Sequence, residues 1–471
     1  MKRLISALCA LAMVMVTHTP APARFKGSQG TAGTHVPAAF VSSTRTETAL
    51  TFSEESDHTN QVLEWNQIFI DTLIATNTAN SSSQRLGAIL HTAVFDAYNG
   101  IERRYTPIFV HDEAPRGASR RAAVIAAAYT TLAGLFTSRQ AALEASYVAS
   151  LAALSDDGED GGQSRARGLA WGEKVALAVL DWRLTDGFLG SYPAFVGGTA
   201  VGQWRPVPPS TSMSSQGLAF TETFVLESST QFRPAPPRGL TGATYADDFN
   251  AVKALGRQTG SARTDEQTAL APFWEGNASV HWNQAANQMA RANGLSLSDS
   301  NRLLALLNVA MADTAITVWS TKRFYGADPS VVTWRPATSI PLAEADGNPD
   351  TAPDAGWLPL ITTPSHPEYP AGHPSLNGAA AAVLLGHFGD AQTFTLTTRL
   401  NNIPLPDRTY SSIAQARSDG NNARVWGGMH YPSTVQISDG VGEMIADYVN
   451  RNSMQPLHGA VAGARRHPHT H

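Results

Sequence analysis

The sequence is poor in cysteine and in charge. Its 471 residues include one cysteine, Cys9, and 15% charged residues against 42% hydrophobic ones. A single thiol excludes an internal disulfide framework and a cysteine metal centre. The low charge with a high apolar fraction excludes an intrinsically disordered chain, and a net charge of -5 offers nucleic acid no general attraction. What remains is a globular protein with a large core.

Strand-like alternation of apolar and polar residues is also scarce, so we expect an all-α fold. From Gln61 onward, apolar residues recur at intervals of three and four, the spacing of amphipathic helices. The segment from Leu303 to Trp319 is apolar nearly all round and is predicted to be a central buried helix. Between Gly187 and Arg238 this spacing is lost, which predicts a long irregular segment over the surface, and helices resume near Tyr245.

The ends of the chain differ from its middle. Residues 1–23 combine Lys2 and Arg3 with an apolar run too short to span a bilayer and an Ala-Pro-Ala site, which predicts a signal peptide and export to the periplasm or beyond the cell. No later apolar run reaches the length of a membrane span, so no stable membrane insertion is expected. Residues 24–57 are predicted to be a flexible lead-in and residues 58–452 a helical catalytic domain. The tail, 453–471, is predicted to be disordered, although its histidines leave a metal-binding role open.

Three cations stand in distinctive settings in the C-terminal half. Lys322 follows the buried helix, Arg335 precedes Pro336, and Arg424 lies in ARVWGGMHYPS. The guanidinium forks suit the oxygens of a tetrahedral oxyanion, whereas the lysine ammonium is a compact point charge. Taken alone, Lys322 has a simpler explanation, because a lysine near a helix end complements the helix dipole.

Two histidines lie close to these cations in sequence motifs. His373 follows Pro-Ala-Gly and precedes a run of small residues, so we expect it at a helix N-terminus, where free N–H groups bind anions. His430 follows two glycines, and Ser433 is the expected N-cap of the next helix. A capping or packing role is the alternative for His373 alone. Together, the residues predict an oxyanion cradle in which one histidine bonds the central atom and the other moves a proton.

This pattern resembles the signature of vanadium-dependent haloperoxidases and the related phosphatidic acid phosphatases and bacterial acid phosphatases: Lys, Arg-Pro, Pro-Ser-Gly-His, then Ser-Arg-x5-His. It is matched here by Lys322, Arg335-Pro336, Pro370-Ala371-Gly372-His373 and Arg424-x5-His430. Segments such as RLGAILHTAVFDAYN and DGNPDTAPDAGWLPLITTPSHPEYPAGH are similar to the exported bacterial haloperoxidase branch. The resemblance covers most of residues 61–450 and implies a large helical-bundle domain with its active-site half at about 300–450.

The resemblance also implies a cofactor and roles. Vanadate would bind with its vanadium on His430, while His373 would serve as the acid–base group and Lys322 would assist catalysis. The residues implied to bind the oxyanion are Lys322, Arg335, Gly372, His373, Arg424 and His430. The implied reaction is the oxidation of halide by hydrogen peroxide to hypohalous acid, which acts on a small organic acceptor.

Other functions stay open at this point. The same cradle suits a phosphate ester hydrolase with a phosphohistidine at His430, because vanadate and the phosphoryl transition state share trigonal-bipyramidal geometry. A third reading is an oxyanion-binding protein without turnover. The sequence leaves the halide, the acceptor and the oligomeric state open.

The chain departs from the family pattern at several positions. Lys322 and Arg335 are separated by twelve residues rather than six, so GADPSV is interpreted as an inserted loop. Ala371 replaces a serine of the family pattern, which removes one hydroxyl from the cradle, and Ala423 replaces the serine before the second arginine. Thr434 occupies the place of the aspartate that orients the second histidine. The nearest acid, Asp439, lies about one turn further along the helix.

Other polar or aromatic positions are interpreted as structural. Arg85, His91 and Asp96 are expected to form structural hydrogen bonds, and Asp313 to satisfy a buried partner. The cluster Trp274, His281 and Trp282 is expected in the core, with an approach to the pocket as the alternative.

Overall fold

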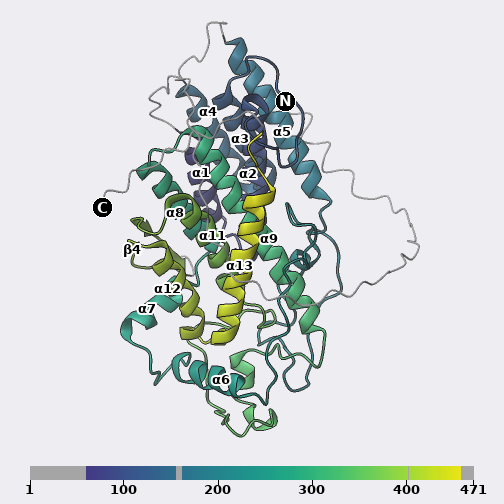
Figure 1. Ribbon diagram of the computed structural model, residues 1–471, viewed down its shortest axis with the longest axis vertical. Coiled ribbons are helices and arrows are strands. Elements are labelled where there is room, and N and C mark those ends of the chain that lie inside the picture. The colour runs from purple at the N-terminus through teal and green to yellow at the C-terminus, as the bar shows by residue number, and fades with distance from the viewer. Residues whose placement is uncertain (1–59, 155–161, 401–402, 458–471) are drawn as a thin grey trace, which may run out of the picture. The chain divides into compact units, whose positions relative to one another are not determined.

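The structure is a computed structural model that describes residues 60–154, 162–400 and 403–457. Helices dominate this part of the chain, so the predicted all-α class is confirmed (Figure 1). The helices are α1 Gln61–Ala75, α2 Asn80–Glu102, α3 Arg120–Leu135, α4 Gln140–Ala152, α5 Gln163–Leu184, α6 Ala243–Leu255, α7 Asp265–Phe273, α8 Ala278–Ala292, α9 Leu297–Gly326, α10 Pro336–Ser339, α11 Gly372–Phe388, α12 Ile413–Trp426 and α13 Pro432–Asn452. The predicted signal peptide and the lead-in up to residue 57 lie outside the described residues.

Short elements connect the helices. The 3₁₀ turns are η2 Thr137–Arg139, η3 Gln216–Phe220 and η4 Ala343–Ala345. The strands are β1 Phe394–Leu396 with β4 Arg408–Tyr410, and β2 Arg399–Leu400 with β3 Ile403–Pro404, both pairs antiparallel. In the first pair, Phe394 stands opposite Tyr410.

Helix α9 is the central element, as its all-round apolar sequence predicted. It packs against α2 on one side and α11 and α13 on another. Among the described residues it is the one helix long and apolar enough to cross a membrane, contrary to the expectation that no such segment exists. However, 94% of its most apolar window is buried inside the protein, so here it forms the core.

The single acid of this apolar segment has buried partners, as expected. The carboxylate of Asp313 accepts the backbone N–H groups of Phe224, Val225 and Leu226 at 2.6, 2.9 and 3.0 Å. Burial raises the pKa of this carboxyl group, while the three N–H groups lower it. Asp313 thereby ties the irregular segment 187–238 to α9.

The irregular segment is more deeply anchored than expected. Its backbone has only the short turn η3, as the loss of periodicity predicted, but the segment does not simply run over the surface. The side chains of Trp204, Leu218 and Leu226 are at most 4% exposed and pack in the main core. Buried apolar area stabilises such a segment without regular hydrogen bonding.

Helices α11 and α13 pack with their backbones nearly touching. A side-chain carbon at Gly442 would lie 1.8 Å from the carbonyl oxygen of Ser375, and one at Gly378 would lie 2.1 Å from that of Asp439. Only glycine fits at these positions. This close contact fixes the first turns of α11, where His373 lies, against the middle of α13, the helix that follows His430.

The polar residues of α2 have structural partners, as predicted. Arg85 forms a buried ion pair with Asp186 at 2.7 Å, and His91 hydrogen-bonds Asn66 at 3.1 Å. Asp96 accepts three backbone N–H groups of residues 108–110, each at 2.8 Å. Burial lowers the pKa of His91 to about 3 and raises that of Asp96 to about 6.

The chain remains packed for a few residues beyond Asn452, where the tail was expected to begin. Met454 is fully buried in the core, and Pro456 pairs with Tyr105 in an isolated bridge. Residues 458–471, with their histidines, lie outside the described residues.

Candidate active site

The predicted cationic and histidine residues come from different elements. Lys322 lies in the last turns of α9, Arg335 directly precedes α10, and His373 lies in the first turn of α11. Arg424 lies in the last turn of α12, and His430 in the loop before α13. All except the half-buried His373 are at most 2% exposed. Burial lowers the pKa of His430 well below its ordinary value, and the charges of Arg335, Lys322 and Arg424 lower it further.

Lys322 and Arg335 meet at one loop despite the twelve residues between them. The ammonium of Lys322 donates to the carbonyl oxygens of Pro367 and Glu368 at 2.6 and 3.1 Å. Arg335 also binds Pro367 O, at 3.4 Å. The longer spacing therefore leaves the lysine beside the arginine. Burial, followed by the charge of Arg335, lowers the pKa of Lys322 well below its ordinary value.

All five N–H groups of Arg335 have acceptors. Nε donates to His366 O at 3.0 Å, one terminal nitrogen to Met429 O at 2.9 Å and His430 Nε2 at 3.0 Å, and the other to His366 Nδ1 at 2.8 Å and Pro367 O. Burial lowers the pKa of this guanidinium to about 9. In this state Arg335 uses all of its N–H groups within the protein, and none is left for a ligand.

Arg424 differs from Arg335 in its partners. Its Nε and NH1 atoms are buried without a hydrogen-bond partner among the described residues. Burial lowers the pKa of Arg424 to about 10, against the opposing effect of Glu275. A buried cation with unused N–H groups is costly unless an anion satisfies it. Arg424 is therefore the group of the cradle that most needs a bound oxyanion.

The hydrogen bonds of His430 fix its tautomer. Nε2 accepts from the guanidinium of Arg335, which can only donate, so Nδ1 carries the proton and donates it to Glu368 Oε1 at 2.9 Å. Glu368 also accepts from the N–H of Tyr431 at 3.2 Å and the hydroxyl of Thr434 at 3.1 Å. His430 is thus neutral, with the Nε2 lone pair facing the cations.

Glu368 is the acid that the sequence analysis missed. It orients His430 from the loop before α11, and Thr434, at the place of the family's aspartate, binds this glutamate instead. Burial raises the pKa of Glu368 to about 7, although Arg335 and Lys322 oppose the shift. Its place in PEYPAGH, five residues before His373, was the available signal.

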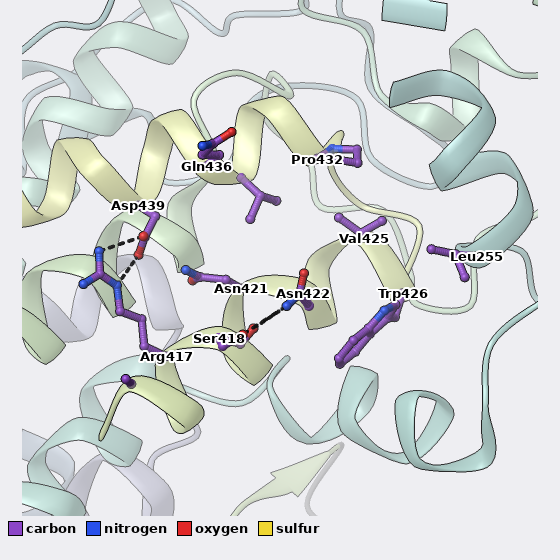
Figure 2. A pocket seen from close by; sticks show the side chains of 12 residues that line it. Leu255, Arg417, Ser418, Asn421, Asn422, Val425, Trp426, Pro432, Gln436 and Asp439 are labelled. Carbon is purple, nitrogen blue, oxygen red and sulfur yellow. Dashed lines mark hydrogen bonds and ion pairs between the residues drawn. The ribbon is translucent and has the colours of Figure 1, made fainter. Parts of the chain in front are cut away.

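Asp439, the nearest acid in the sequence after Thr434, does not contact His430. It pairs with Arg417 through two hydrogen bonds of 2.7 Å (Figure 2). The pair lines a pocket of about 480 Å³ between α12 and α13. None of the cradle side chains lines this pocket, so it is separate from the site described above.

The expected N-cap at Ser433 was wrong. Helix α13 begins at Pro432, with Tyr431 as its N-cap residue, and Ser433 lies inside the first turn. The N–H and hydroxyl groups of Ser433 both donate to the carboxylate of Asp248. An acid from α6 thus satisfies the helix end, which short-range sequence rules do not anticipate.

The start of α11 matches the expected anion-binding geometry. Ala371 is its N-cap residue and supplies no side-chain cap, while its own N–H donates to Ser438 Oγ at 2.7 Å. The first N–H groups of a helix have no partner within the helix and point toward an incoming anion. A side-chain carbon at Gly372 would meet only the ring of Trp319, at 3.5 Å, so space remains beside the helix start.

His373 contacts two groups through one ring nitrogen. Its Nε2 lies 3.2 Å from Asn80 Nδ2 and 3.2 Å from the carbonyl oxygen of Gly276. Burial, and next the charge of Arg424, lower the pKa of His373 well below its ordinary value. The ring is therefore neutral near pH 7.

A third histidine, His366, was not anticipated from the sequence. Its Nδ1 accepts from Arg335 at 2.8 Å, so its proton resides on Nε2, and its ring centroid lies 5.1 Å from that of Trp319. Arg335 thus donates from one terminal nitrogen to His430 and from the other to His366. Burial, and next the charges of Lys322 and Arg335, lower the pKa of His366.

The aromatic cluster beyond this site lies in the core, as expected. Trp274 and Trp282 donate from Nε1 to Tyr410 OH and Asn377 Oδ1, each at 3.0 Å. His281 stacks on Phe273 with 5.4 Å between ring centroids. Both ring nitrogens of His281 are buried without a partner among the described residues, and burial lowers its pKa to about 4.

The site fits a tetrahedral oxyanion better than a bare metal cation. Within residues 60–154, 162–400 and 403–457, no group of three His, Cys, Asp or Glu side chains is arranged to hold a metal ion. Instead, Arg335 donates to the Nε2 lone pair of the neutral His430, the charges of Lys322 and Arg424 also act on this ring, and Arg424 has unused donors. Vanadate meets these conditions: the cations would hold its oxygens, and His430 Nε2 offers the bond to vanadium.

The fold is shared with helical-bundle proteins of the vanadium haloperoxidase type. Residues 302–459 match the family model described as "VCPO second helical-bundle domain". A bacterial vanadium-dependent iodoperoxidase structure is similar with a TM-score of 0.71 and 21% identity, covering 86% of this chain and 99% of its own.

Two structures of a bacterial vanadium-dependent chloroperoxidase are also similar. The apo form has a TM-score of 0.61 and 16% identity, and the match covers 79% of this chain and 95% of its own. The holo form has a TM-score of 0.60 and 17% identity, and the match covers 79% of this chain and 92% of its own. A search of curated protein sequences gives no match. The resemblance to the vanadium haloperoxidase superfamily is confirmed, with the fold shared over most of the chain and the family match over its C-terminal third.

Proposed function

We propose that the protein is a vanadate-dependent haloperoxidase, which uses hydrogen peroxide to oxidise halide to hypohalous acid. The observation that supports this most is a neutral His430 with its lone pair on Nε2, in a site that also holds the Arg424 guanidinium with unsatisfied N–H groups. The fold around them is shared with bacterial iodo- and chloroperoxidases. When bound, vanadate supplies Lewis-acid activation of peroxide toward halide without changing its oxidation state.

Several residues of the site have separate roles in the proposed reaction. Glu368 holds the Nδ1 proton of His430, so that Nε2 presents its lone pair. Arg424, with its free N–H groups, and Lys322 offset the charge of the oxyanion, as preorganised donors do in a buried site. His373 is the acid–base group at the start of α11, where the helix N-terminus also favours an anion.

Binding of vanadate to His430 has a structural consequence. The Nε2 lone pair is occupied by Arg335 at 3.0 Å, so the guanidinium must release this bond before vanadium can take it. The released N–H group would then be available to an oxygen of the anion. Arg335 would thereby bind the oxyanion, which is the role that the family resemblance implies for it.

A phosphate ester hydrolase is the second candidate. The same histidine–carboxylate pair, His430 with Glu368, suits a nucleophile that forms a phosphohistidine, since the carboxylate stabilises the charge that the imidazole gains. In the peroxidase proposal, the hypohalous acid would act on a small organic acceptor, and the protein would be exported from the cytoplasm.

The two functions respond oppositely to vanadate. Purified protein, freed of phosphate and vanadate, is assayed for peroxide-dependent bromination of a phenol dye and for hydrolysis of p-nitrophenyl phosphate, with and without orthovanadate. We expect bromination only with vanadate and its loss in His430→Ala. Hydrolysis that vanadate inhibits, without bromination, would favour the phosphatase. Binding of vanadate without either activity would favour a protein that has lost turnover.

A further inference from the structure

The side chain of Asn80, at the start of α2, has a fixed orientation. Its Oδ1 accepts the backbone N–H of Ala278 at 2.9 Å and the amide of Gln84 at 3.0 Å. A backbone N–H can only donate, so the oxygen of Asn80 must face Ala278, and its NH₂ group must face the other way. On that side it lies 3.2 Å from His373 Nε2.

An NH₂ group facing Nε2 determines where His373 carries its proton. A donor at 3.2 Å is satisfied only when Nε2 is unprotonated, which places the proton of the neutral ring on Nδ1. The carbonyl oxygen of Gly276 lies at the same distance from Nε2 and favours the opposite state, in which Nε2 is protonated. Asn80 and Gly276 therefore compete for one ring nitrogen.

The other groups around the ring determine whether it is charged. Arg424 and His281 both lower the pKa of His373, while the carbonyls of Gly276 and Glu275 raise it less than burial lowers it. The carboxylate of Glu275 acts on Arg424 and is itself shifted toward its protonated form by burial. The surroundings thus favour the neutral ring, and its tautomer depends on the two contacts at Nε2, the NH₂ group of Asn80 and the carbonyl oxygen of Gly276.

We propose that Asn80 is a positioning residue for His373, which holds Nε2 unprotonated so that Nδ1–H is the donor turned toward the oxyanion cradle. Because Nε2 is taken up by Asn80 and Gly276, Nδ1 is the nitrogen left for the cradle. When the ring becomes protonated during turnover, Gly276 O accepts the new Nε2–H. The catalytic consequence rests on the proposed function, whereas the tautomer itself does not.

The substitution Asn80→Asp tests this directly. Aspartate keeps an oxygen for Ala278 N–H and Gln84, so the contact between α2 and α8 is retained, but it turns the donor at Nε2 into a charged acceptor. Asn277→Asp is the control of equal charge, because its Oδ1 caps α8 through Ser279 N–H, and the donor that it loses faces Thr78 O and not His373.

The first measurement is the ¹⁵N NMR spectrum of the histidine rings in vanadate-free protein, with His373 assigned by its loss in His373→Gln. We expect an unprotonated, pyridine-type Nε2 in the wild type and Asn277→Asp, and a protonated, pyrrole-type Nε2 in Asn80→Asp. Asn80→Ala, which removes the donor without adding charge, should shift the ring partly toward Nε2–H. A pyrrole-type Nε2 in the wild type, or identical spectra for wild type and Asn80→Asp, would overturn the proposal.

The second measurement is the pH profile of vanadate-dependent bromination. An opposite charge within hydrogen-bonding distance raises a pKa by about 1 to 3, so the limb governed by His373 should move to higher pH by that amount in Asn80→Asp only. An equal displacement in Asn277→Asp would show a general charge effect and contradict the role of Asn80. Absence of bromination in every protein, with the NMR result as expected, would refute the proposed function and leave the tautomer assignment standing.

Discussion

The two arginines of the cradle should respond to the same substitution with opposite changes in stability. Arg424 has buried Nε and NH1 atoms without hydrogen-bond partners among the described residues, and Glu275 offsets the burial of its charge only in part. A buried cation whose donors lack partners is costly, so an apolar side chain of similar volume should be neutral or stabilising at this position. We therefore expect Arg424→Met to raise the unfolding temperature of the vanadate-free protein.

The same substitution should abolish tight oxyanion binding. Two hydrogen bonds to a charged group, from Nε and NH1, are worth roughly 1.5 to 3 kcal/mol each. Their loss amounts to about 3 to 6 kcal/mol, or an affinity lower by about 10²- to 10⁴-fold. Millimolar vanadate should raise the unfolding temperature of the wild type and leave that of Arg424→Met unchanged, because a ligand stabilises only a native state that binds it.

Arg335→Met is the control within the same site. It would leave His430 Nε2, His366 Nδ1 and the carbonyl oxygens of His366 and Met429 without their donor, and each buried unsatisfied group costs about 1 to 3 kcal/mol. We expect its unfolding temperature to fall below that of the wild type. The measurement is differential scanning calorimetry of the three proteins, with and without vanadate, in phosphate-free buffer. A destabilised Arg424→Met that vanadate still protects would refute the assignment of Arg424 as the unsatisfied donor.

Three further predictions concern the histidines and Ala371. His430→Ala should lose vanadate retention, measured by equilibrium dialysis, whereas His373→Ala should retain it and slow turnover by about 10²- to 10⁴-fold; equal losses of affinity would contradict this division. Ala371→Ser should tighten vanadate by about tenfold in a titration, equivalent to about 1.4 kcal/mol, and an unchanged affinity would mean that position 371 does not face the anion. His281→Phe should reduce the acid sensitivity of folding: the native pKa of His281 is about 4 against 6.5 for the unfolded chain, so only the unfolded state gains a proton as the pH falls from 6.5 to 4, and stability is lost there. Parallel urea titrations of wild type and variant across that range check this, and equal slopes with pH would contradict it.

The sequence predicted the features that depend on local patterns. Three- and four-residue spacing marked the long helices, and the Pro-Ala-Gly-His motif placed His373 at a helix start, as the structure shows. The all-round apolar run of α9 predicted its burial. These signals are local because helix formation and capping are decided within a few residues.

The features that the sequence did not predict depend on tertiary contacts. Glu368 lies 62 residues from His430, and Asn80 lies 293 residues from His373, so no spacing rule links them. Asp439 was the nearest acid along the chain, but its helical position turns it toward Arg417. Asp248 took the capping role expected of Ser433 for the same reason. Partners of buried polar groups are selected by packing, which the linear sequence does not display.

The most direct test of the cradle is a crystal structure of the protein with bound orthovanadate. We predict an anion bonded through vanadium to His430 Nε2, with its oxygens within hydrogen-bonding distance of Arg424 Nε and NH1, and with the Arg335 guanidinium no longer donating to that imidazole nitrogen. His430 Nδ1 should still donate to Glu368. An anion bound elsewhere, or an unchanged hydrogen bond from Arg335 to His430 Nε2 at full occupancy of vanadate, would contradict the assignment of this site.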